Sequence, residues 1–270
     1  MNFKICNTLL FSLSLGVTAL MSSCDSYKKA VDSNPTELAV LSYNIHHANP
    51  PSKPDFIDID AICKVIKDAD VDIIALQEVD VNTSRSAGFN QAKEIAKQLN
   101  MSYRFYKAID FEDGSYGIAI MSRLPIRNAK TVKLPQVEKA ENRILALLEV
   151  KINGQWVSVI NTHLDSSKGH ANRNTQMAYL VDLAEKNNNP TILCGDLNSW
   201  PNSEAIKILD KSFKRTCLKD CEPTVPQVKP RNVIDYIATK NFPWNQKSIT
   251  VIQEEYASDH RPVKVVFALN

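Results

Sequence analysis

The sequence predicts an α/β fold: a four-layer α/β sandwich in which two packed mixed β-sheets are flanked by helices. Three observations lead to this prediction. Strand-like apolar runs alternate with amphipathic helical segments at both ends of the chain, the middle is rich in strands, and the roughly 250 residues after the N-terminal segment suit one large sheet domain. Hydrophobic residues make up 44% of the chain and charged residues 23%, as is typical of a globular protein with a large core.

The first half of the domain begins with a buried strand at 37–43, ELAVLSY. Helical spacing of apolar residues predicts helices at 55–70 and 90–100, with a strand at 71–76 after the first of them. The inner faces of these helices are expected to be formed by Ile62, Val65, Ile66 and Ala69, and by Ala92, Ile95, Ala96 and Leu99. Further strands are expected at 103–108, 116–122, 143–152 and 156–161.

The second half returns to alternating helices and strands. A long helix at 171–186 would bury Met177, Leu180, Val181 and Ala184. After it we expect a strand at 191–194, a short helix at 203–209, and strands at 233–239, 249–252 and 263–269. Because alternation at both ends encloses a run of hairpins, the two sheets should pack face to face with helices outside them.

The N-terminus has the features of a secretory signal. Lys4 precedes an apolar run at 8–20, which is shorter than the roughly 20 residues of a spanning helix, and small residues precede Cys24. This resembles a bacterial lipobox, with Met21 where leucine is usual, so we expect a signal peptide at 1–23 and lipidation of Cys24. An ordinary cleaved signal or a plain membrane anchor is the alternative.

The polar segment 24–36 lacks apolar periodicity and would act as a flexible tether, reaching about 20 Å, before a catalytic domain at 37–270. The chain is therefore expected to be exported and held by the acylated Cys24 to the lipid bilayer of a bacterial membrane, on its periplasmic or cell-surface side. We expect it to be a monomer.

The net charge is +2 with no long basic stripe, so tight, nonspecific binding to DNA is not predicted.

Export would place the cysteines in an oxidising compartment. Cys63 lies in a helical pattern and Cys194 in an apolar strand, so both are expected to be buried small hydrophobes. Cys217 and Cys221 flank a turn-like pair and could form a local disulfide or remain free thiols. A zinc site is disfavoured, because no second CxxC or histidine pair accompanies them.

Polar residues occur repeatedly where the apolar strands end. They are Asn44, Glu78, His163, Asp196, Asn198, Asp235 and the run Ser258, Asp259 and His260 just before the last strand. Since strand ends converge on one rim of a sheet, residues that are distant in sequence can form one site there.

The chain also contains, in this order, the motifs SYNIHH, LQEVD, GIAIMSRLPI, ENR, NTHLD, GDLNS, IDYI and SDHRPV. Their order resembles that of the endonuclease/exonuclease/phosphatase family, from about residue 38 to the end of the chain. Two departures, Asn142 in place of a common proline and Ile118 in place of asparagine, remove no charged catalytic group. The THLD and YNIHH forms look most like an exported bacterial lipoprotein branch.

The resemblance implies metal-assisted attack of water on a phosphoryl group, with Mg²⁺ or Mn²⁺ as the cofactor. A hard dication prefers oxygen ligands, so Glu78 is the first candidate ligand, followed by Asn44 and Asp259. Glu78 could instead be a solvated carboxylate, and Asn44 could simply form an Asx-turn at a strand end.

By the same resemblance, Asp196 orients or deprotonates the attacking water and Asn198 holds the water or the phosphate. Residues two apart in an extended segment point the same way, so both side chains could face one phosphorus atom. The alternative for Gly195 to Asn198 is a plain turn, because all four residue types favour loops.

His260 should lie near the scissile phosphate, with its other ring nitrogen hydrogen-bonded to Asp235. His163 and Arg143 would supply donors to the nonbridging oxygens, and Tyr116 is either a further donor or a core residue. His46 and His47 would face opposite sides of an extended backbone, so at most one would reach the site.

Near the start of the long helix, His170, Asn172 and Arg173 could bind a phosphate, but a solvated helix terminus is the expected role.

Among other phosphoesterases, dinuclear metallophosphatases need histidine motifs that the five histidines here do not form. An inactive lipoprotein binding module on the same scaffold and a nuclease remain as alternatives. Fold does not choose a substrate among nucleic acids, phospholipids and sugar or inositol phosphates, nor diester over monoester.

Overall fold

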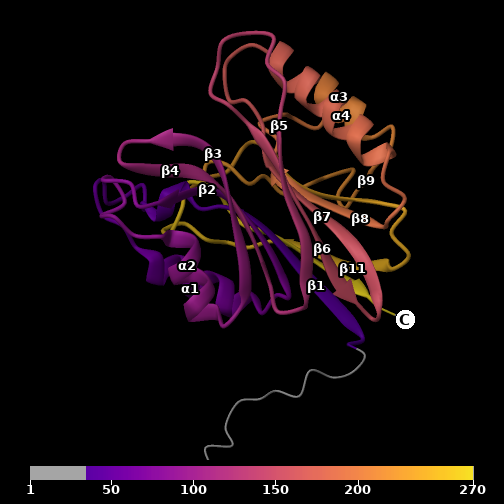
Figure 1. Cartoon of the computed structure of the whole chain (residues 1–270), viewed down its shortest axis with the longest axis horizontal. Helices are drawn as coiled ribbons and strands as arrows, with labels where there is room; N and C mark the ends of the chain where they lie inside the picture. The colour runs from indigo at the N-terminus through magenta and orange to yellow at the C-terminus, as the bar shows by residue number, and fades with distance from the viewer. Residues whose placement is uncertain (1–34, 270) are drawn as a thin grey trace, which may run out of the picture. The chain divides into compact units, whose positions relative to one another are not determined.

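Two six-stranded β-sheets form the centre of the part of the chain that the computed structural model describes, residues 35–269 (Figure 1). The predicted signal peptide, Cys24 and most of the predicted tether lie outside these residues. The first sheet has the order β11-β12-β1-β2-β4-β3, with strands Asn245–Val251, Val263–Ala268, Glu37–Asn44, Ile73–Val81, Gly114–Ser122 and Ser102–Phe111. The second has the order β5-β6-β7-β8-β10-β9, with strands Ile126–Lys133, Ile144–Ile152, Gln155–His163, Thr191–Asp196, Asp235–Lys240 and Lys214–Arg215.

Each sheet has a parallel pair among otherwise antiparallel strands. In the first sheet β1 runs parallel to β2, and in the second β7 runs parallel to β8. A helix connects the strands of each pair, as expected for parallel neighbours. The helices are α1 (Ile59–Ala69), α2 (Gln91–Leu99), α3 (Ala171–Glu185) and α4 (Glu204–Leu209), and a short 3₁₀ helix, η1, covers His46–Ala48.

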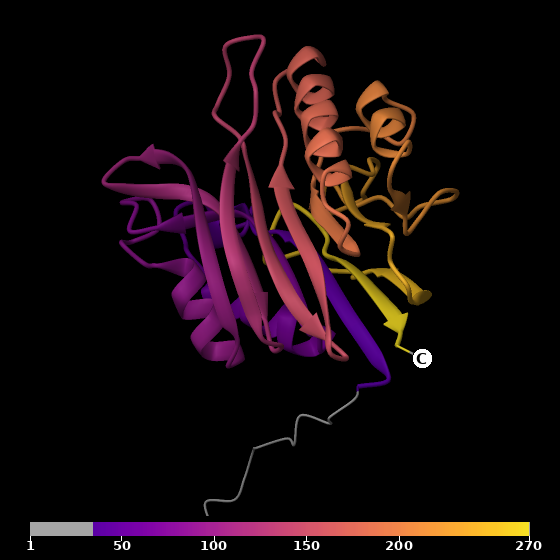
Figure 2. The same cartoon turned by 45° about the vertical axis from the view of Figure 1, so that its right-hand side comes forward.

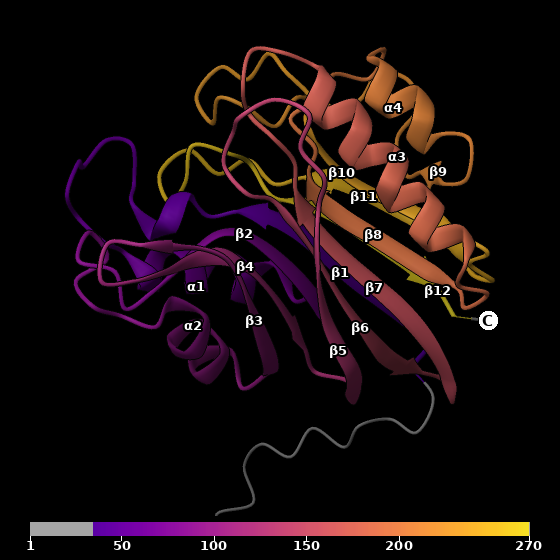
Figure 3. The ribbon, with the colours of Figure 1, turned by 45° about the horizontal axis from the view of Figure 1, so that its top comes forward.

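The helices lie on the outer sides of the two sheets. Figures 1 and 3 show α1 and α2 beside the first sheet and α3 and α4 beside the second, with the sheets between them. The predicted sandwich of two packed mixed sheets flanked by helices is therefore confirmed. No helix within residues 35–269 is both long and apolar enough to cross a bilayer.

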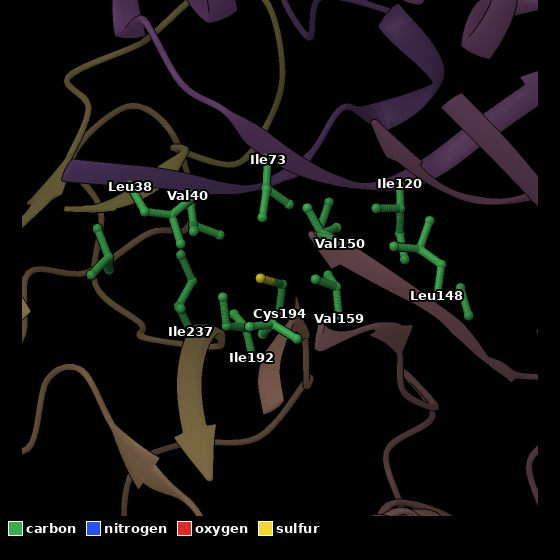
Figure 4. Packing of buried hydrophobic residues seen from close by; sticks show 14 of the residues in the cluster. Leu38, Val40, Ile73, Ile120, Leu148, Val150, Val159, Ile192, Cys194 and Ile237 are labelled. Carbon is green, nitrogen blue, oxygen red and sulfur yellow. The ribbon is translucent and has the colours of Figure 1, made fainter. Parts of the chain in front are cut away.

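The main core lies between the sheets. Figure 4 shows Leu38, Val40 and Ile73 of the first sheet pointing toward Ile192 and Ile237 of the second, and all five are buried. Burying side chains of this size contributes about 1.5–3 kcal/mol each. This contact holds the two sheets, and the strand ends that they carry, in one fixed arrangement.

The structure contains two strands that the sequence analysis did not predict, and several boundaries differ: β2 runs to Val81, β11 begins at Asn245, and the first helix begins later than expected. The edge strand β5 was missed because most of its residues are exposed and polar, so no apolar pattern marks it. The two-residue β9 was too short to detect. The first helix was expected from residue 55 but begins at Ile59, after Asp58 accepts a capping hydrogen bond from the backbone nitrogen of Ala61 at 2.9 Å.

The described cysteines behave largely as expected. Cys63 and Cys194 are buried free thiols, which confirms their role as small hydrophobes. Cys217 and Cys221 form a disulfide, so of the two alternatives the local bridge is present.

Candidate active site

The first part of the site forms at the end of β1, beside a bulge within β2 that the sequence analysis did not predict. The pairing of β2 with β4 shifts register between Leu76 and Val79. Glu78 lies in this bulge with φ at 56°, in a left-handed region that residues other than glycine seldom adopt. A bulge re-aims a side chain. Here it brings the Glu78 carboxylate to Asn44, at the end of β1, where Asn44 Nδ2 lies 3.0 Å from Glu78 Oε1.

Asn161, on β7 of the other sheet, braces this bulge. Its Nδ2 donates to the backbone oxygen of Leu76 at 2.8 Å and to that of Ala119 at 2.9 Å. Its Oδ1 accepts a hydrogen bond from Gln77 Nε2 at 2.7 Å, and both side chains are fully buried. Buried polar groups need such partners. The position of Glu78 in the first sheet therefore depends on a side chain from the second.

Asn44 links the two parts of the site. Its Nδ2 also donates to Asp196 Oδ2 at 3.1 Å, while its Oδ1 accepts from the backbone nitrogen of His46 at 3.1 Å. The Asx-turn considered for Asn44 is thus present, and the same side chain joins two carboxylates. Its oxygen would face a metal on Glu78 only after the amide turned over and gave up the bond from His46. The role of Asn44 as a metal ligand stays a prediction.

Asp196, the last residue of β8, lies at the centre of the site and is 1% exposed. Three nitrogen atoms surround its Oδ2: Asn44 Nδ2 at 3.1 Å, His163 Nε2 at 3.5 Å and His260 Nε2 at 3.8 Å. Burial raises the pKa of Asp196 to about 7, and the charge of Asp235 adds to this rise. The structure therefore brings residues from β1, β7, β8 and the segment before β12 to one oxygen atom.

His260 is held by Asp235, as predicted from the sequence. His260 Nδ1 lies 2.9 Å from Asp235 Oδ2, and both residues are buried. Burial lowers the pKa of His260, but the charge and hydrogen bond of Asp235 outweigh this effect and raise it to about 10. Thr224 Oγ1 donates to the same Asp235 oxygen at 2.5 Å. Both partners thus fix the orientation of the Asp235 carboxylate.

His163 and Arg143 form a second buried pair beside Asp196. Arg143 Nη1 lies 3.2 Å from His163 Nδ1 and 2.9 Å from Glu141 Oε1. A guanidinium only donates, so His163 Nδ1 must accept and the neutral ring carries its hydrogen on Nε2, toward Asp196. Burial, and then the charge of Arg143, lower the pKa of His163 well below its usual value. The ring is therefore a neutral donor at neutral pH.

Tyr116, on β4, lines one small cavity together with Arg143 and His163. Its ring is buried, and burial followed by the charge of Glu78 raises the pKa of its hydroxyl. Tyr116 thus packs in the core and also borders the site. Its role as a donor to the substrate stays a prediction.

Asn198 does not share an extended segment with Asp196, and that expectation is wrong. β8 ends at Asp196, and Asn198 has a φ of 46°. The backbone nitrogen of Asn198 donates to Asp196 Oδ1 at 2.9 Å, and its Nδ2 donates to the oxygen of Leu164 at 3.1 Å. The alternative of a turn therefore describes this segment better. Asn198 still lies beside Asp196, because the turn folds back on that carboxylate.

The side of the site that carries Glu78 and Asp259 fits a hard dication. Burial raises the pKa of Glu78, and the charge of Asp259 raises it further. Among residues 35–269, neither carboxylate forms an ion pair with a lysine or an arginine. The nearest candidate is His47, whose Nδ1 lies 4.0 Å from Glu78 Oε2, but burial and then the charge of Arg85 lower its pKa to about 4. Two carboxylates that pair with no lysine or arginine, although the charge of His260 acts on both, match the ligands that Mg²⁺ and Mn²⁺ prefer.

A second set of atoms could also hold a metal ion. Ligand atoms of Asp196, Asp235 and His260 all lie within 4.8 Å of one another. Within this set, however, Asp235 Oδ2 and His260 Nδ1 already satisfy each other at 2.9 Å. We therefore regard Glu78, with Asp259, as the better candidate for the first metal ligand.

The paired histidines lie on η1 and not on an extended backbone. Both have positive φ values, 46° at His46 and 42° at His47. His46 Nδ1 lies 2.8 Å from the backbone oxygen of Asn49, whereas His47 Nδ1 lies 4.0 Å from Glu78 Oε2. His47 thus contacts the candidate metal ligand, and the expectation that at most one of the two reaches the site stays a prediction.

Asn172 and Arg173 are not part of a solvated helix terminus, and that expectation is wrong for both. Asn172 is buried and its Oδ1 accepts from the backbone nitrogens of Val137 and Glu138. Arg173 is buried and donates to the backbone oxygen of Asp165 at 2.9 Å. They hold the loop between β5 and β6 and the loop after β7 against α3. Figure 2 shows the β5–β6 connection projecting beyond the strand ends, next to one end of α3.

Sequence reasoning missed Asn161, Thr224 and Arg85. A polar residue between apolar strand residues is a usable signal for Asn161, which follows Val159 and Ile160. No local pattern identifies Thr224, whose contact with Asp235 depends on how a loop folds back. Arg85 follows the LQEVD motif in a loop and makes two hydrogen bonds to Asp80, at 2.7 and 2.9 Å.

Comparison with known proteins supports the order of motifs found here. A sequence model described as the Endonuclease/Exonuclease/phosphatase family matches residues 41–260, which include all the site residues discussed above. A protein described as a putative neutral sphingomyelinase from Drosophila melanogaster is 25% identical over 191 residues. That match covers 64% of this chain and 42% of the relative, so the chain spans less than half of that protein.

Solved structures share the fold. An endonuclease/exonuclease/phosphatase from Beutenbergia cavernae has a TM-score of 0.73 at 21% identity, covering 87% of this chain and 72% of that one. A mannosyl-6-phosphatase from Bacteroides thetaiotaomicron has a TM-score of 0.70 at 21% identity, covering 84% of this chain and 98% of that one. At these identities the likeness establishes the sandwich and not the substrate.

Proposed function

Since the chain belongs to the Endonuclease/Exonuclease/phosphatase family, whose members are hydrolases such as phosphatases and nucleases, we propose that it hydrolyses a phosphate ester with the help of Mg²⁺ or Mn²⁺. One observation carries the proposal: the Asp196 oxygen that faces Asn44, His163 and His260. A buried carboxylate next to several N–H donors can hold a water molecule beside a phosphoryl group and accept its proton.

The chain's own residues would divide the reaction between them. Asp196 accepts the proton of the attacking water. His260, kept protonated by Asp235, and His163, a neutral donor on Nε2, hold the phosphoryl oxygens on which negative charge develops. Such fixed donors stabilise the transition state without reorganising during the reaction.

The dication would be held by Glu78 and Asp259, with Asn44 as a further candidate. When bound, it supplies charge neutralisation at the phosphoryl oxygens. The family is generally dependent on divalent metals, and the oxygen donors here suit magnesium or manganese better than zinc.

A chromogenic phosphodiester, bis(p-nitrophenyl) phosphate, tests the metal dependence. Activity should vanish in excess chelator and return with Mg²⁺ or Mn²⁺. Glu78→Gln should shift the metal titration to higher concentration, with part of the rate recovered at saturating Mg²⁺, because one ligand charge is lost while the shape is kept. Glu204→Gln, an exposed glutamate on α4, serves as the matched control and should leave the titration unchanged.

Two outcomes would contradict this proposal. Activity that survives exhaustive chelation would exclude a required dication. An unchanged metal titration in Glu78→Gln would place the ligand elsewhere, with Asp196, Asp235 and His260 as the next set to test. A complete lack of hydrolysis on any phosphate ester would instead support the binding-module alternative.

The substrate class is open to a direct screen. The two relatives point in different directions, since one is described as a sphingomyelinase and the other as a mannosyl-6-phosphatase. The panel should therefore hold sphingomyelin vesicles, sugar phosphates, phosphoinositides and nucleic acids. Nuclease activity is the second candidate, and hydrolysis of single- or double-stranded DNA above that of the small esters would favour it.

The location of the chain is a separate part of the proposal and rests on the sequence. We expect a membrane-anchored, exported monomer that is lipidated at Cys24, which lies outside the described residues. The wild-type chain should partition into detergent, and Cys24→Ser should not, because thioether lipidation needs that sulfur. Partitioning of the wild type into the aqueous phase would replace the lipobox with an ordinary signal peptide.

A further inference from the structure

Arg85 lies between β2 and α2 and is held by a carboxylate inside the protein. Its Nε and Nη2 donate to the two oxygens of Asp80 at 2.7 and 2.9 Å. Asp80 has no exposed surface, and Oδ2 also accepts from Thr83 Oγ1 at 2.8 Å and Ser86 Oγ at 2.5 Å. Such a bidentate pair fixes the plane of a guanidinium as well as its position.

The loop that carries Arg85 does not need this side chain as its brace. The hydroxyls of Thr83 and Ser86 bind Asp80 independently of it. The backbone nitrogen of Arg85 donates to Glu112 Oε2 at 2.7 Å, and that of Asn82 donates to the oxygen of Phe89 at 2.8 Å. The Asp80 carboxylate therefore anchors the loop through these two hydroxyls and, in addition, orients the guanidinium.

The guanidinium faces the rim of the active site. Its Cζ atom lies 4.2 Å from the ring centre of Phe111 and 5.4 Å from that of Tyr116. Tyr116 lines the same small cavity as Arg143 and His163, so Arg85 contacts a residue that also borders the donors assigned to the scissile phosphate.

Arg85 differs from Arg143 in having an unused donor on a side chain that is partly exposed, whereas the unused Nε of Arg143 is buried. Arg143 is buried and its Nη1 is shared between Glu141 and His163. The Arg85 side chain is 30% exposed, and among residues 35–269 its Nη1 makes no hydrogen bond. An arginine oriented by a buried carboxylate, with an open edge at the rim of a phosphoesterase site, is suited to bind an anion.

We propose that Arg85 forms a second anion subsite, which binds a phosphate or carboxylate group carried by the substrate next to the scissile phosphate. The proposal rests on the proposed function, because it takes Asp196 and its neighbours as the place of the scissile group. It narrows the substrate class to phosphate esters with at least two anionic groups, such as sugar or polyol bisphosphates, over esters with one.

Direct binding tests the subsite without relying on catalysis. Isothermal titration calorimetry in Mg²⁺ would compare glucose 6-phosphate with glucose 1,6-bisphosphate, and fructose 6-phosphate with fructose 1,6-bisphosphate, in an Asp196→Asn background that prevents turnover. At least one bisphosphate should bind about 10-fold more tightly than its monophosphate, since a hydrogen bond to a charged group has this effect. Arg85→Gln should remove that preference and change the affinity for the monophosphate less than about 2-fold.

Two further variants make the result specific. Arg104→Gln, an exposed arginine on β3 of the same sheet, should keep the preference and controls for the loss of one positive charge. Arg85→Lys keeps the positive charge but lacks the planar guanidinium with its paired donors, so it should retain part of the preference for the bisphosphate. If Arg85→Gln lowers the melting temperature enough to show that the loop has unfolded, Arg85→Lys becomes the variant that tests the proposal.

Equal affinity for each bisphosphate and its monophosphate in the Arg85-containing background would overturn the subsite. An equal loss of affinity for the bisphosphate and its monophosphate in Arg85→Gln would also overturn the subsite, because Arg85 would then only support the fold of its loop. Because these outcomes are read from binding, they differ from failure of the proposed function, in which no phosphate ester is hydrolysed whether or not the preference exists.

Discussion

The two sheets contribute unlike halves to the active site. At the second sheet, Asp235 lies 2.9 Å from His260, which comes from the segment before β12 of the first sheet, and Asp196 stands next to them with its carboxylate surrounded by nitrogen atoms. At the first sheet, Glu78 is only half-buried and lies 4.0 Å from a neutral histidine. One half has its charges balanced by the protein. The other leaves carboxylates that a dication would balance.

The backbone of the two halves differs in the same way. Asp196 and Asp235 are direct register partners in regular antiparallel strands, so ordinary pairing places them. Glu78 lies in a bulge at positive φ and depends on Asn161 from the opposite sheet. Regular pairing thus positions Asp196 and Asp235, whereas an irregular, braced segment positions the candidate metal ligand Glu78. A contact removed from one half should therefore leave the other half intact.

The largest effect is expected from Asp196→Asn. The change keeps the shape of the side chain but removes the proton acceptor, so kcat should fall by about 10² or more with KM little changed. Steady-state kinetics on bis(p-nitrophenyl) phosphate would measure it. Asp182→Asn, at an exposed aspartate on α3, is the control and should have no effect. A normal kcat would remove Asp196 from the role of base.

A double-mutant cycle tests whether Asp235 acts only through His260. His260→Ala should lower kcat by about 10² or more, and Asp235→Asn by the same factor or less. The double variant should be hardly slower than His260→Ala alone, because the carboxylate only orients and charges the imidazole. Losses that multiply would show that Asp235 works independently, as a metal ligand would.

The strand-end rule predicted most of this site, because it depends on topology alone. Once β1, β2, β7 and β8 were recognised as apolar runs, the polar residues that end them had to meet at one rim. Asn44, His163 and Asp196 end their strands as that rule requires, whereas Glu78 lies in a bulge within β2, which continues to Val81. The pairing of Asp235 with His260 followed from family resemblance, and the distance of 2.9 Å confirms the contact.

The rest depended on contacts that local patterns do not encode. The bulge at Glu78 and the turn at Asn198 arise from register and backbone geometry, so period-based reasoning placed Asn198 wrongly. Asn172 was predicted to be solvated because the loops that bury it come from a distant part of the chain. Packing between elements, rather than composition, decides these positions.

A smaller effect is expected at the brace of the first half. Asn161→Ala would leave the oxygens of Leu76 and Ala119 without donors in a buried place, which should lower the free energy of unfolding by about 2–4 kcal/mol. Because the bulge then relaxes, the Mg²⁺ concentration for half-maximal activity should rise more than kcat falls. Urea denaturation and a metal titration measure the two effects.

Asn245→Ala, at the exposed start of β11, is the control for Asn161→Ala and should change neither quantity. The prediction separates the halves of the site: the metal requirement should move while the Asp235 and His260 pair still operates. A fall in kcat at saturating Mg²⁺ as large as that of His260→Ala would contradict it, because the damage would then have reached the second half.

The smallest effect is expected at Thr224, whose hydroxyl contacts the carboxylate behind His260 and, more distantly, the backbone oxygen of Asn232 at 3.5 Å. Thr224→Val keeps the volume and removes the hydroxyl that donates to Asp235 Oδ2 at 2.5 Å, so kcat should fall about 3- to 10-fold with KM little changed. Thr224→Ser should restore the rate, since it returns the donor. Thr216→Val, which removes a hydroxyl bound to the backbone oxygen of Ile237 at 2.8 Å, should cost similar stability without lowering kcat. In an Asp235→Asn background, Thr224→Val should have no further effect on kcat. If serine fails to rescue, or if the Thr216 variant slows the enzyme equally, Thr224 supports the fold of its loop and does not position the catalytic pair.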